Sequence, residues 1–224
     1  MNESMLSRGR GLYVVTPDEP ETARLLAKVA RVLAARPVLL QYRNKFAPAA
    51  LRREQAASLL VLCRAAGVPM LVNDDLALAI EIAADGVHLG RDDGDAAAAR
   101  RALDALGPGR ILGVSCYNQW ARAVAGEAAG ADYVAFGAMF ASPTKPAASR
   151  ASLALLGRAR RELKAAVAAI GGITLENAGA LVAAGADLVA VISDVFDAPD
   201  PGARARAYQE LLRGWNNRGG SCGE

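Results

Sequence analysis

The chain has few of the residues that build imidazole or thiolate metal centres. Its 224 residues include one histidine and three widely separated cysteines, Cys63, Cys116 and Cys222. One histidine excludes a cluster of imidazole ligands, and three scattered cysteines argue against a disulfide framework or a zinc cluster. Cys63 shares an apolar helical face with Leu59 and Leu62, so we expect it to be a buried structural thiol.

Long apolar runs and concentrated charge are also scarce. No stretch approaches the roughly 18 apolar residues of a membrane span, and residues 1–10 lack the apolar segment of a signal peptide. The formal net charge is +3, and basic and acidic residues are interleaved without the stripe that marks nucleic-acid binding. We expect a soluble, cytoplasmic protein that binds small molecules rather than nucleic acid or membranes. A homo-oligomer is compatible with the sequence.

Short apolar runs are plentiful, and they alternate with segments that have helical signals. The expected strands are residues 11–16, 38–43, 70–73, 86–89, 111–115, 133–136, 167–170 and 188–192. The expected helices are residues 22–34, 48–66, 95–106, 120–129, 153–165 and 175–184, with a small one within 74–85. The strands are apolar on both faces, which is typical of buried parallel strands. Thr174 is placed to cap the helix that follows it.

This alternation predicts an α/β fold, a single-domain (β/α)8 TIM barrel. Eight strand-like runs exceed the five or six of an open doubly wound sheet, and no Gly-x-Gly-x-x-Gly fingerprint follows the first run. We expect an N-terminal extension over residues 1–10, the barrel over 11–215, and a tail without regular structure over 216–224. In such a barrel the carboxyl ends of all strands open on one face, which carries the active site.

Polar residues or glycines follow most of these runs. Arg43 and Lys45, at alternate positions after the second run, could grip one anion, although they could equally be surface charges. Carboxylates after the third and fourth runs suit Mg²⁺, which takes one or two carboxylates together with phosphate oxygens. We assign that role to Asp74 and Asp93, and helix capping to Asp75 and Asp92.

Two later segments suit phosphate. Residues 142–146 combine Ser142, Thr144 and Lys145 with two prolines and form either an anion-binding loop or a solvated turn. Gly171 and Gly172 precede a helix N-terminus, where phosphate binds readily, although a tight turn without ligand is the alternative.

Neither His88 nor the Ser115–Cys116 pair indicates a catalytic base or nucleophile. His88 lies inside an apparent buried strand, where a hydrogen-bonded core or supporting role is favoured over catalysis. Ser115 and Cys116 have no histidine or cysteine partner at a spacing that would support covalent catalysis.

In their order, these motifs resemble the thiamine phosphate synthase family over about residues 11–196. The matching segments are 12–16 (LYVVT), 41–45 (QYRNK), 73–74 (ND), 84–90 (ADGVHLG), 113–115 (GVS), 130–133 (GADY), 140–146 (FASPTKP), 170–173 (IGGI) and 191–193 (VIS). The resemblance implies a TIM-barrel transferase that couples an aminopyrimidine diphosphate to a carboxythiazole phosphate. Pyrophosphate and CO₂ are released, and thiamine phosphate forms through a dissociative pyrimidine cation.

The resemblance also implies a set of site residues. Arg43, Lys45, Lys145 and Ser115 would be catalytic, and Asp74 and Asp93 would bind Mg²⁺. The substrate-binding residues would be Gln41, Tyr42, Arg43, Asn44, Lys45, Asn73, Ser115, Ser142, Pro143, Thr144, Lys145, Gly171, Gly172, Ile192 and Ser193.

Three positions depart from the family pattern. Tyr42 is a mild change, Asn44 replaces the usual glutamate before Lys45, and Arg91 stands where glutamine is common. A thiazole tautomerase of the same barrel family, or a non-catalytic thiamine-phosphate-binding protein, is the alternative. The full set of cations and carboxylates favours the synthase.

Overall fold

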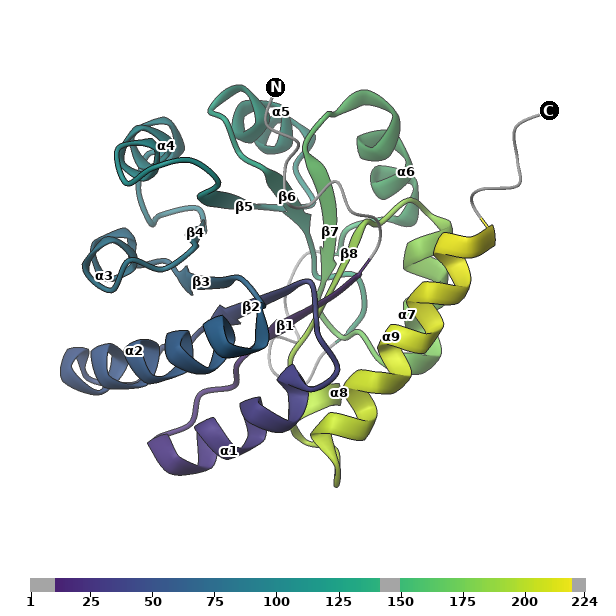
Figure 1. Ribbon diagram of the computed structural model, residues 1–224. Helices are drawn as coiled ribbons and strands as arrows, with labels where there is room; N and C mark the ends of the chain where they lie inside the picture. The colour runs from purple at the N-terminus through teal and green to yellow at the C-terminus, as the bar shows by residue number, and fades with distance from the viewer. Residues whose placement is uncertain (1–10, 142–149, 219–224) are drawn as a thin grey trace.

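A computed structural model describes residues 11–141 and 150–218, and these residues form a closed eight-stranded parallel barrel (Figure 1). The strands are β1 (Gly11–Val15), β2 (Leu39–Tyr42), β3 (Met70–Asn73), β4 (Gly86–Leu89), β5 (Ile111–Tyr117), β6 (Tyr133–Phe136), β7 (Ala166–Ile170) and β8 (Leu188–Val191). The helices are α1 (Thr22–Leu33), α2 (Ala49–Ala66), α3 (Leu76–Glu81), α4 (Ala96–Asp104), α5 (Trp120–Ala128), α6 (Leu153–Glu162), α7 (Leu175–Ala183), α8 (Ser193–Phe196) and α9 (Pro201–Arg218).

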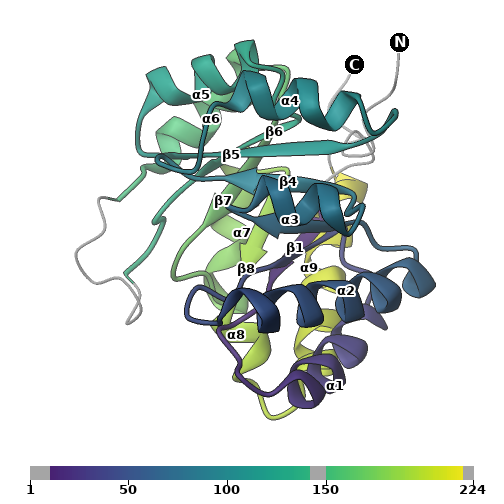
Figure 2. The same ribbon diagram turned by 90° about the vertical axis from the view of Figure 1, so that its left-hand side faces the viewer.

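Each strand pairs in parallel with the next, and β1 pairs with β8 to close the barrel. The predicted TIM barrel is therefore confirmed. The helices lie outside the strands, and α1 packs between α2 and α9 (Figures 1 and 2). Within the described residues, no helix is both long and apolar enough to cross a membrane.

The predicted elements differ from the observed ones mainly at their ends. β5 continues to Tyr117, two residues past the predicted end at 115, with a register shift against β6 between Ser115 and Tyr117. α6 ends at Glu162 rather than at residue 165. α8 and α9 were not predicted. α9 packs on α1 and α7 and runs to Arg218, so the helix passes the boundary at 216 that we expected for an irregular tail.

Strand alternation divides the core into two layers. Leu12 and Val14 of β1 point outward into the layer between strands and helices, whereas Tyr13 and Val15 point into the barrel. The inner layer also contains Tyr133 of β6 and residues from five other strands, and most of its side chains are fully buried. The barrel interior is thus a packed core, and its upper end forms the floor of the mouth.

Gly113 makes room for the largest side chain of this inner layer. Gly113 of β5 is in register with Tyr133 of β6, and a Cβ atom at Gly113 would overlap the Tyr133 ring. The missing side chain lets the ring cross the neighbouring strand. Tyr133 is entirely buried, so its ring cannot turn out into solvent without opening the core.

We expect Gly113→Ala to lower the free energy of unfolding by about 1–3 kcal/mol, because the added methyl overpacks the core. Urea unfolding followed by circular dichroism measures the change. Gly126→Ala in α5 is the matched control, because a Cβ there makes ordinary contacts of 3.5 Å and alanine favours a helix. Equal stability of the two variants would show that Tyr133 does not need this space.

Candidate active site

Side chains from the carboxyl ends of β2, β3 and β4 surround a cavity of about 260 Å³. Six of the predicted site residues line it: Tyr42, Asn44, Lys45, Asn73, Asp74 and Asp93. The structure therefore brings together residues that lie up to about fifty positions apart in the chain, as expected for the mouth of a barrel.

Asp74 and Asp93 converge on this cavity. Asp74 follows β3 with a left-handed φ of 63°, and its backbone N–H donates to the carbonyl of His88 at 2.8 Å. Asp93 Oδ2 accepts a hydrogen bond from the N–H of Gly90 at 2.9 Å. Partial desolvation and the neighbouring Asp74 carboxylate raise the pKa of Asp93. Two carboxylates in contact repel each other, and a cation between them would relieve that repulsion.

Lys45 supplies a cation to the same place. Its Nζ lies 3.3 Å from Asp74 Oδ2, and about half of the Lys45 side chain is exposed to the mouth. Among the described residues there is no group of three or more histidine, cysteine, aspartate or glutamate side chains that could hold a metal. Mg²⁺ commonly takes one or two protein carboxylates together with water or substrate oxygens.

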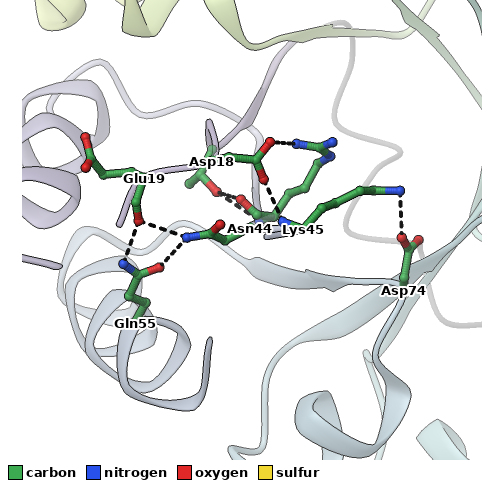
Figure 3. Close-up of polar contacts among 8 residues, drawn as sticks. Asp18, Glu19, Asn44, Lys45, Gln55 and Asp74 are labelled. Carbon is green, nitrogen blue, oxygen red and sulfur yellow. Dashed lines mark hydrogen bonds and ion pairs between the residues drawn. The ribbon is translucent and has the colours of Figure 1, made fainter. Parts of the chain in front are cut away.

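The loop after β1 holds the segment after β2 in place (Figure 3). Asp18 Oδ2 accepts from Arg43 Nη1 at 2.9 Å, and Asp18 Oδ1 accepts from the Lys45 N–H at 2.6 Å. The Thr16 hydroxyl both accepts from the Arg43 N–H and donates to the Arg43 carbonyl, each at 2.8 Å. Arg43 and Lys45 thus pair with two different carboxylates, Asp18 and Asp74, rather than pointing freely at one anion.

Asn44 lines the cavity from the side of α2, away from the barrel interior. Its side chain is buried and donates to the carbonyl of Glu19 at 2.8 Å and to Gln55 Oε1 at 3.0 Å (Figure 3). Tyr42 donates to the same Gln55 oxygen at 3.0 Å, and the Gln55 amide group donates to the Glu19 carbonyl at 2.9 Å. Strand alternation places Tyr42 and Asn44 on the outer face. Their polar groups therefore bind the segment after β2 to α2. Asn44, which stands where the family usually has glutamate, belongs to this supporting network.

Inside the barrel, Gln41, Ser115 and His88 belong to one hydrogen-bonded chain. The His88 ring contacts the Tyr133 hydroxyl through Nδ1 and the Ser115 hydroxyl through Nε2, each at 2.8 Å. Tyr133 contacts the Tyr13 hydroxyl at 2.7 Å, and Gln41 Nε2 donates to Tyr13 at 2.6 Å. Burial lowers the pKa of His88 to about 4, so the ring is neutral at physiological pH. The predicted supporting role of His88 is confirmed, since both ring nitrogens are bonded.

Several other sequence predictions can be compared with the structure. Cys63 is fully buried, and desolvation raises the pKa of its thiol to about 12. Asp75 caps α3 by accepting from the N–H of Leu78 at 2.9 Å. The capping role assigned to Asp92 was wrong, because Asp95 caps α4. Arg91 stacks its guanidinium 4.7 Å from the centre of the Tyr117 ring.

The ends of β7 and β8 form the other side of the mouth. Gly171 and Gly172 have left-handed φ angles of 100° and 64°, and a Cβ atom at either would press on residues 138–141. Thr174 is the N-cap of α7, as predicted, and Asn177 Oδ1 accepts from its N–H at 2.9 Å. Asp194 Oδ2 accepts from the N–H of Leu175 at 3.3 Å, which joins the starts of α7 and α8.

Ile192 and Ser193 stand at the start of α8, and Ser193 is exposed. Ser142, Pro143, Thr144 and Lys145 lie outside the described residues. The second phosphate site predicted from these segments therefore stays a prediction.

The sequence did not reveal some residues of the site. Asp18 resembles an ordinary loop acid, and Tyr13 and Tyr133 resemble core aromatics, so only the fold shows what they bind. Arg52 of α2 also lines the cavity, and its Nη1 lies 3.8 Å from Asp75. The sequence offered one signal for Arg52, namely its place in the expected helix of residues 48–66, which follows the second strand.

The neutral, buried His88 makes the folded state sensitive to acid. The imidazole pKa rises from about 4 in the folded protein to about 6.5 in the unfolded chain. The unfolded chain binds this proton more readily, so stability falls as pH drops from about 6.5 to about 4 and is unaffected above that range. The total loss from this group is about 3 kcal/mol.

Urea unfolding of the protein and of His88→Gln across this pH range checks the prediction. The stability difference between them should shift in favour of His88→Gln as the pH falls. Parallel stability curves would show that His88 titrates normally in the fold.

Comparisons with known proteins identify the family of this chain. The family model described as thiamine monophosphate synthase matches residues 12–195. A thiamine-phosphate synthase from Aromatoleum aromaticum is 66% identical over 92% of this chain and 98% of its own length, and one from Azoarcus sp. is 63% identical over 93% and 100%.

A solved structure of thiamine phosphate pyrophosphorylase from Pyrococcus furiosus superposes with a TM-score of 0.80 at 30% identity, covering 91% of this chain and 96% of that one. A 3-hexulose-6-phosphate synthase structure, with a TM-score of 0.67 at 20% identity, shares the fold. The chain belongs to the thiamine monophosphate synthase family and has the thiamine-phosphate synthase activity of a transferase in thiamine biosynthesis.

Proposed function

We propose that this enzyme joins an aminopyrimidine diphosphate to a carboxythiazole phosphate, with Mg²⁺ and the end of β2 holding the diphosphate. The observation that carries the proposal is the convergence of Asp74, Asp93 and Lys45 on one cavity. Carboxylates alone would repel a diphosphate. Together with a divalent cation and an ammonium group, they make a site for one.

The residues of the cavity fit a magnesium ion. Asp74 and Asp93 are hard oxygen donors, and partial burial together with the neighbouring Asp74 carboxylate raises the pKa of Asp93. These two residues would hold the ion, and Asn73 would lie beside it at the end of β3. When bound, Mg²⁺ supplies positive charge for the oxygens of the leaving diphosphate.

The side chains around the diphosphate would stabilise its departure. The carbon–oxygen bond breaks, its electron pair leaves with the pyrophosphate, and the pyrimidine methylene carbon becomes a cation stabilised by the ring and its amino group. The thiazole nitrogen then donates its electron pair to that carbon. The carboxylate of the thiazole would leave as CO₂, and the ring carbon that keeps the electron pair would take a proton from solvent. Arg43, paired with Asp18, and Lys45, paired with Asp74, would balance the developing charge on pyrophosphate, and Lys145 would add positive charge.

This reaction depends on positioning rather than on a strong base, which suits the interior of the barrel. His88 is neutral and hydrogen-bonded through both nitrogens. Cys116 is buried, and burial raises the pKa of its thiol to about 12, so it is a poor nucleophile. Gln41 and Ser115 would hold the pyrimidine, and holding it near the thiazole lowers the entropic part of the barrier.

The thiazole phosphate would bind on the opposite side of the mouth. The left-handed glycines 171 and 172 let the turn after β7 pack closely against residues 138–141 just before α7. We assign the phosphate to Gly171, Gly172, Ile192 and Ser193, with Ser142, Pro143 and Thr144 contributing from the loop after β6. Separate sites for the two anions keep the reacting carbon and nitrogen between them.

We expect Mg²⁺-dependent release of pyrophosphate when both substrates are supplied, and Asp93→Asn should raise the Mg²⁺ concentration for half-maximal rate by at least about 10-fold. Asp92→Asn is the matched control, since Asp92 is the adjacent exposed carboxylate outside the cavity. A coupled pyrophosphate assay with a magnesium titration measures both variants.

Folded protein that gives no pyrophosphate with both substrates would contradict the coupling reaction. Isomerisation of the thiazole phosphate alone, without pyrophosphate release, would identify a tautomerase instead. Equal magnesium dependence in the Asp93→Asn and Asp92→Asn variants would contradict the metal assignment and leave the coupling reaction intact.

A further inference from the structure

A continuous chain of hydrogen bonds crosses the interior of the barrel, from buried Gln41 to partly exposed Ser115. Its members come from five strands, in the order Gln41, Tyr13, Tyr133, His88 and Ser115. Successive polar atoms are 2.6, 2.7, 2.8 and 2.8 Å apart. The first four side chains are at most 7% exposed, so water does not compete for these bonds.

Gln41 gives the chain a direction. Its Nε2 carries hydrogens and no acceptor lone pair, so it donates to the Tyr13 oxygen. Each tyrosine hydroxyl has a single hydrogen to donate. The contact between the two tyrosines admits either hydroxyl as donor, but among the described residues only the Tyr133 oxygen is placed to accept the Tyr13 hydrogen. The direction in which every hydrogen has an acceptor therefore runs from Tyr13 to Tyr133 and from Tyr133 to Nδ1 of His88.

This direction determines the tautomer of His88. Nδ1 accepts from Tyr133, so the hydrogen of the neutral ring is on Nε2, which then donates to the Ser115 oxygen. Ser115 receives a hydrogen bond from inside the barrel and keeps its own hydrogen for another acceptor. Ser115 is the partly exposed end of the chain, so that hydrogen is available at the mouth.

We propose that this chain makes Ser115 a fixed hydrogen-bond donor toward the substrate, with Tyr13, Tyr133 and His88 as positioning residues. Ser115 would then select a substrate atom with a free lone pair, such as an unprotonated ring nitrogen of the pyrimidine, and disfavour a protonated one. This selection rests on the proposed function, whereas the direction of the chain does not.

The buried interior favours a single direction of the chain, because the described residues offer its hydroxyl and imidazole groups no other hydrogen-bond partners. If Ser115 donated to His88 instead, the hydrogen of the His88 ring would have to move to Nδ1, and both tyrosine hydroxyls would have to turn their hydrogens the other way. The amide hydrogens of Gln41 would then face the hydroxyl hydrogen of Tyr13. A buried donor or acceptor without a partner is costly, so the whole chain keeps a single direction. Gly113 supports it by leaving space for the Tyr133 ring.

The tautomer can be measured directly, because His88 is the only histidine in the chain. Nitrogen NMR of protein made with isotope-labelled histidine should show one neutral imidazole, with hydrogen on Nε2 and Nδ1 acting as an acceptor. A ring with hydrogen on Nδ1, or a rapid mixture of both tautomers, would overturn the proposal.

Gln41→Glu tests whether the distant amide sets this direction. An ionised carboxylate only accepts, so the Tyr13 hydrogen would turn toward it, and the hydrogen of His88 should move to Nδ1. Spectra from about pH 6 to about pH 9 cover the range above the ordinary carboxyl pKa of about 4.3. Gln41→Leu is the control, because it removes the donor without adding an acceptor and should keep the Nε2 tautomer. An Nε2 tautomer in both variants at all pH values would overturn the proposal.

A double-mutant cycle tests the effect on substrate. Tyr133→Phe should raise KM for the pyrimidine diphosphate by about 10-fold, the value of one hydrogen bond, and leave KM for the thiazole phosphate unchanged. In a Ser115→Ala background it should add no further loss, because it acts through Ser115. Additive losses, or equal effects on both substrates, would contradict the positioning role. An enzyme inactive in coupling would give no kinetics, yet the NMR spectra would still report the direction of the chain.

Discussion

The pairing of β1 with β8 closes the sheet, and the positions of the functional side chains follow from that closure. In a closed parallel barrel, inward residues of all strands share one interior, and residues just past the strands share one mouth. Tyr13 and Tyr133 can therefore meet at 2.7 Å although 120 positions separate them in the chain. The same geometry brings Lys45, Asp74 and Asp93 around one cavity.

The site also depends on a second layer of polar contacts that fasten its loops. Asp18 holds Arg43 and the backbone of Lys45, while Asn44 and Gln55 tie the same segment to the loop before α1 and to α2. These contacts restrict the segment after β2 before any substrate arrives. Electrostatic stabilisation of a leaving group is most effective when the charges are already in place, so these contacts would serve the proposed chemistry.

Much of the fold and part of the site could be predicted from the sequence. Short buried strands that end in polar residues are a local signal, and they gave the barrel and the residues Lys45, Asp74 and Asp93. Helix ends were less certain, and α9 was missed because its polar, alanine-poor second half lacks a strong apolar pattern. Asp92 was taken for the cap of α4 because several aspartates precede that helix, and only backbone geometry selects Asp95.

Other features depend on contacts that a single sequence does not reveal. Whether Asn44 faces the substrate or α2 depends on the alternation of β2 continuing past its last residue. The role of His88 depends on Tyr133, whose ring crosses β5 only because residue 113 is glycine. A tyrosine in a buried strand is ordinarily interpreted as a core residue. The hydrogen-bond partners of its hydroxyl become known only when the fold places other polar groups beside it.

The central proposal is that Asp74 and Asp93, next to Lys45, would hold a divalent cation at the mouth. Crystals grown with Mn²⁺ and pyrophosphate would locate the metal by its anomalous scattering. The account predicts one strong peak within bonding distance of both carboxylates, with pyrophosphate oxygens completing the shell. A metal bound elsewhere, or pyrophosphate bound in the cavity without metal between these two residues, would contradict it.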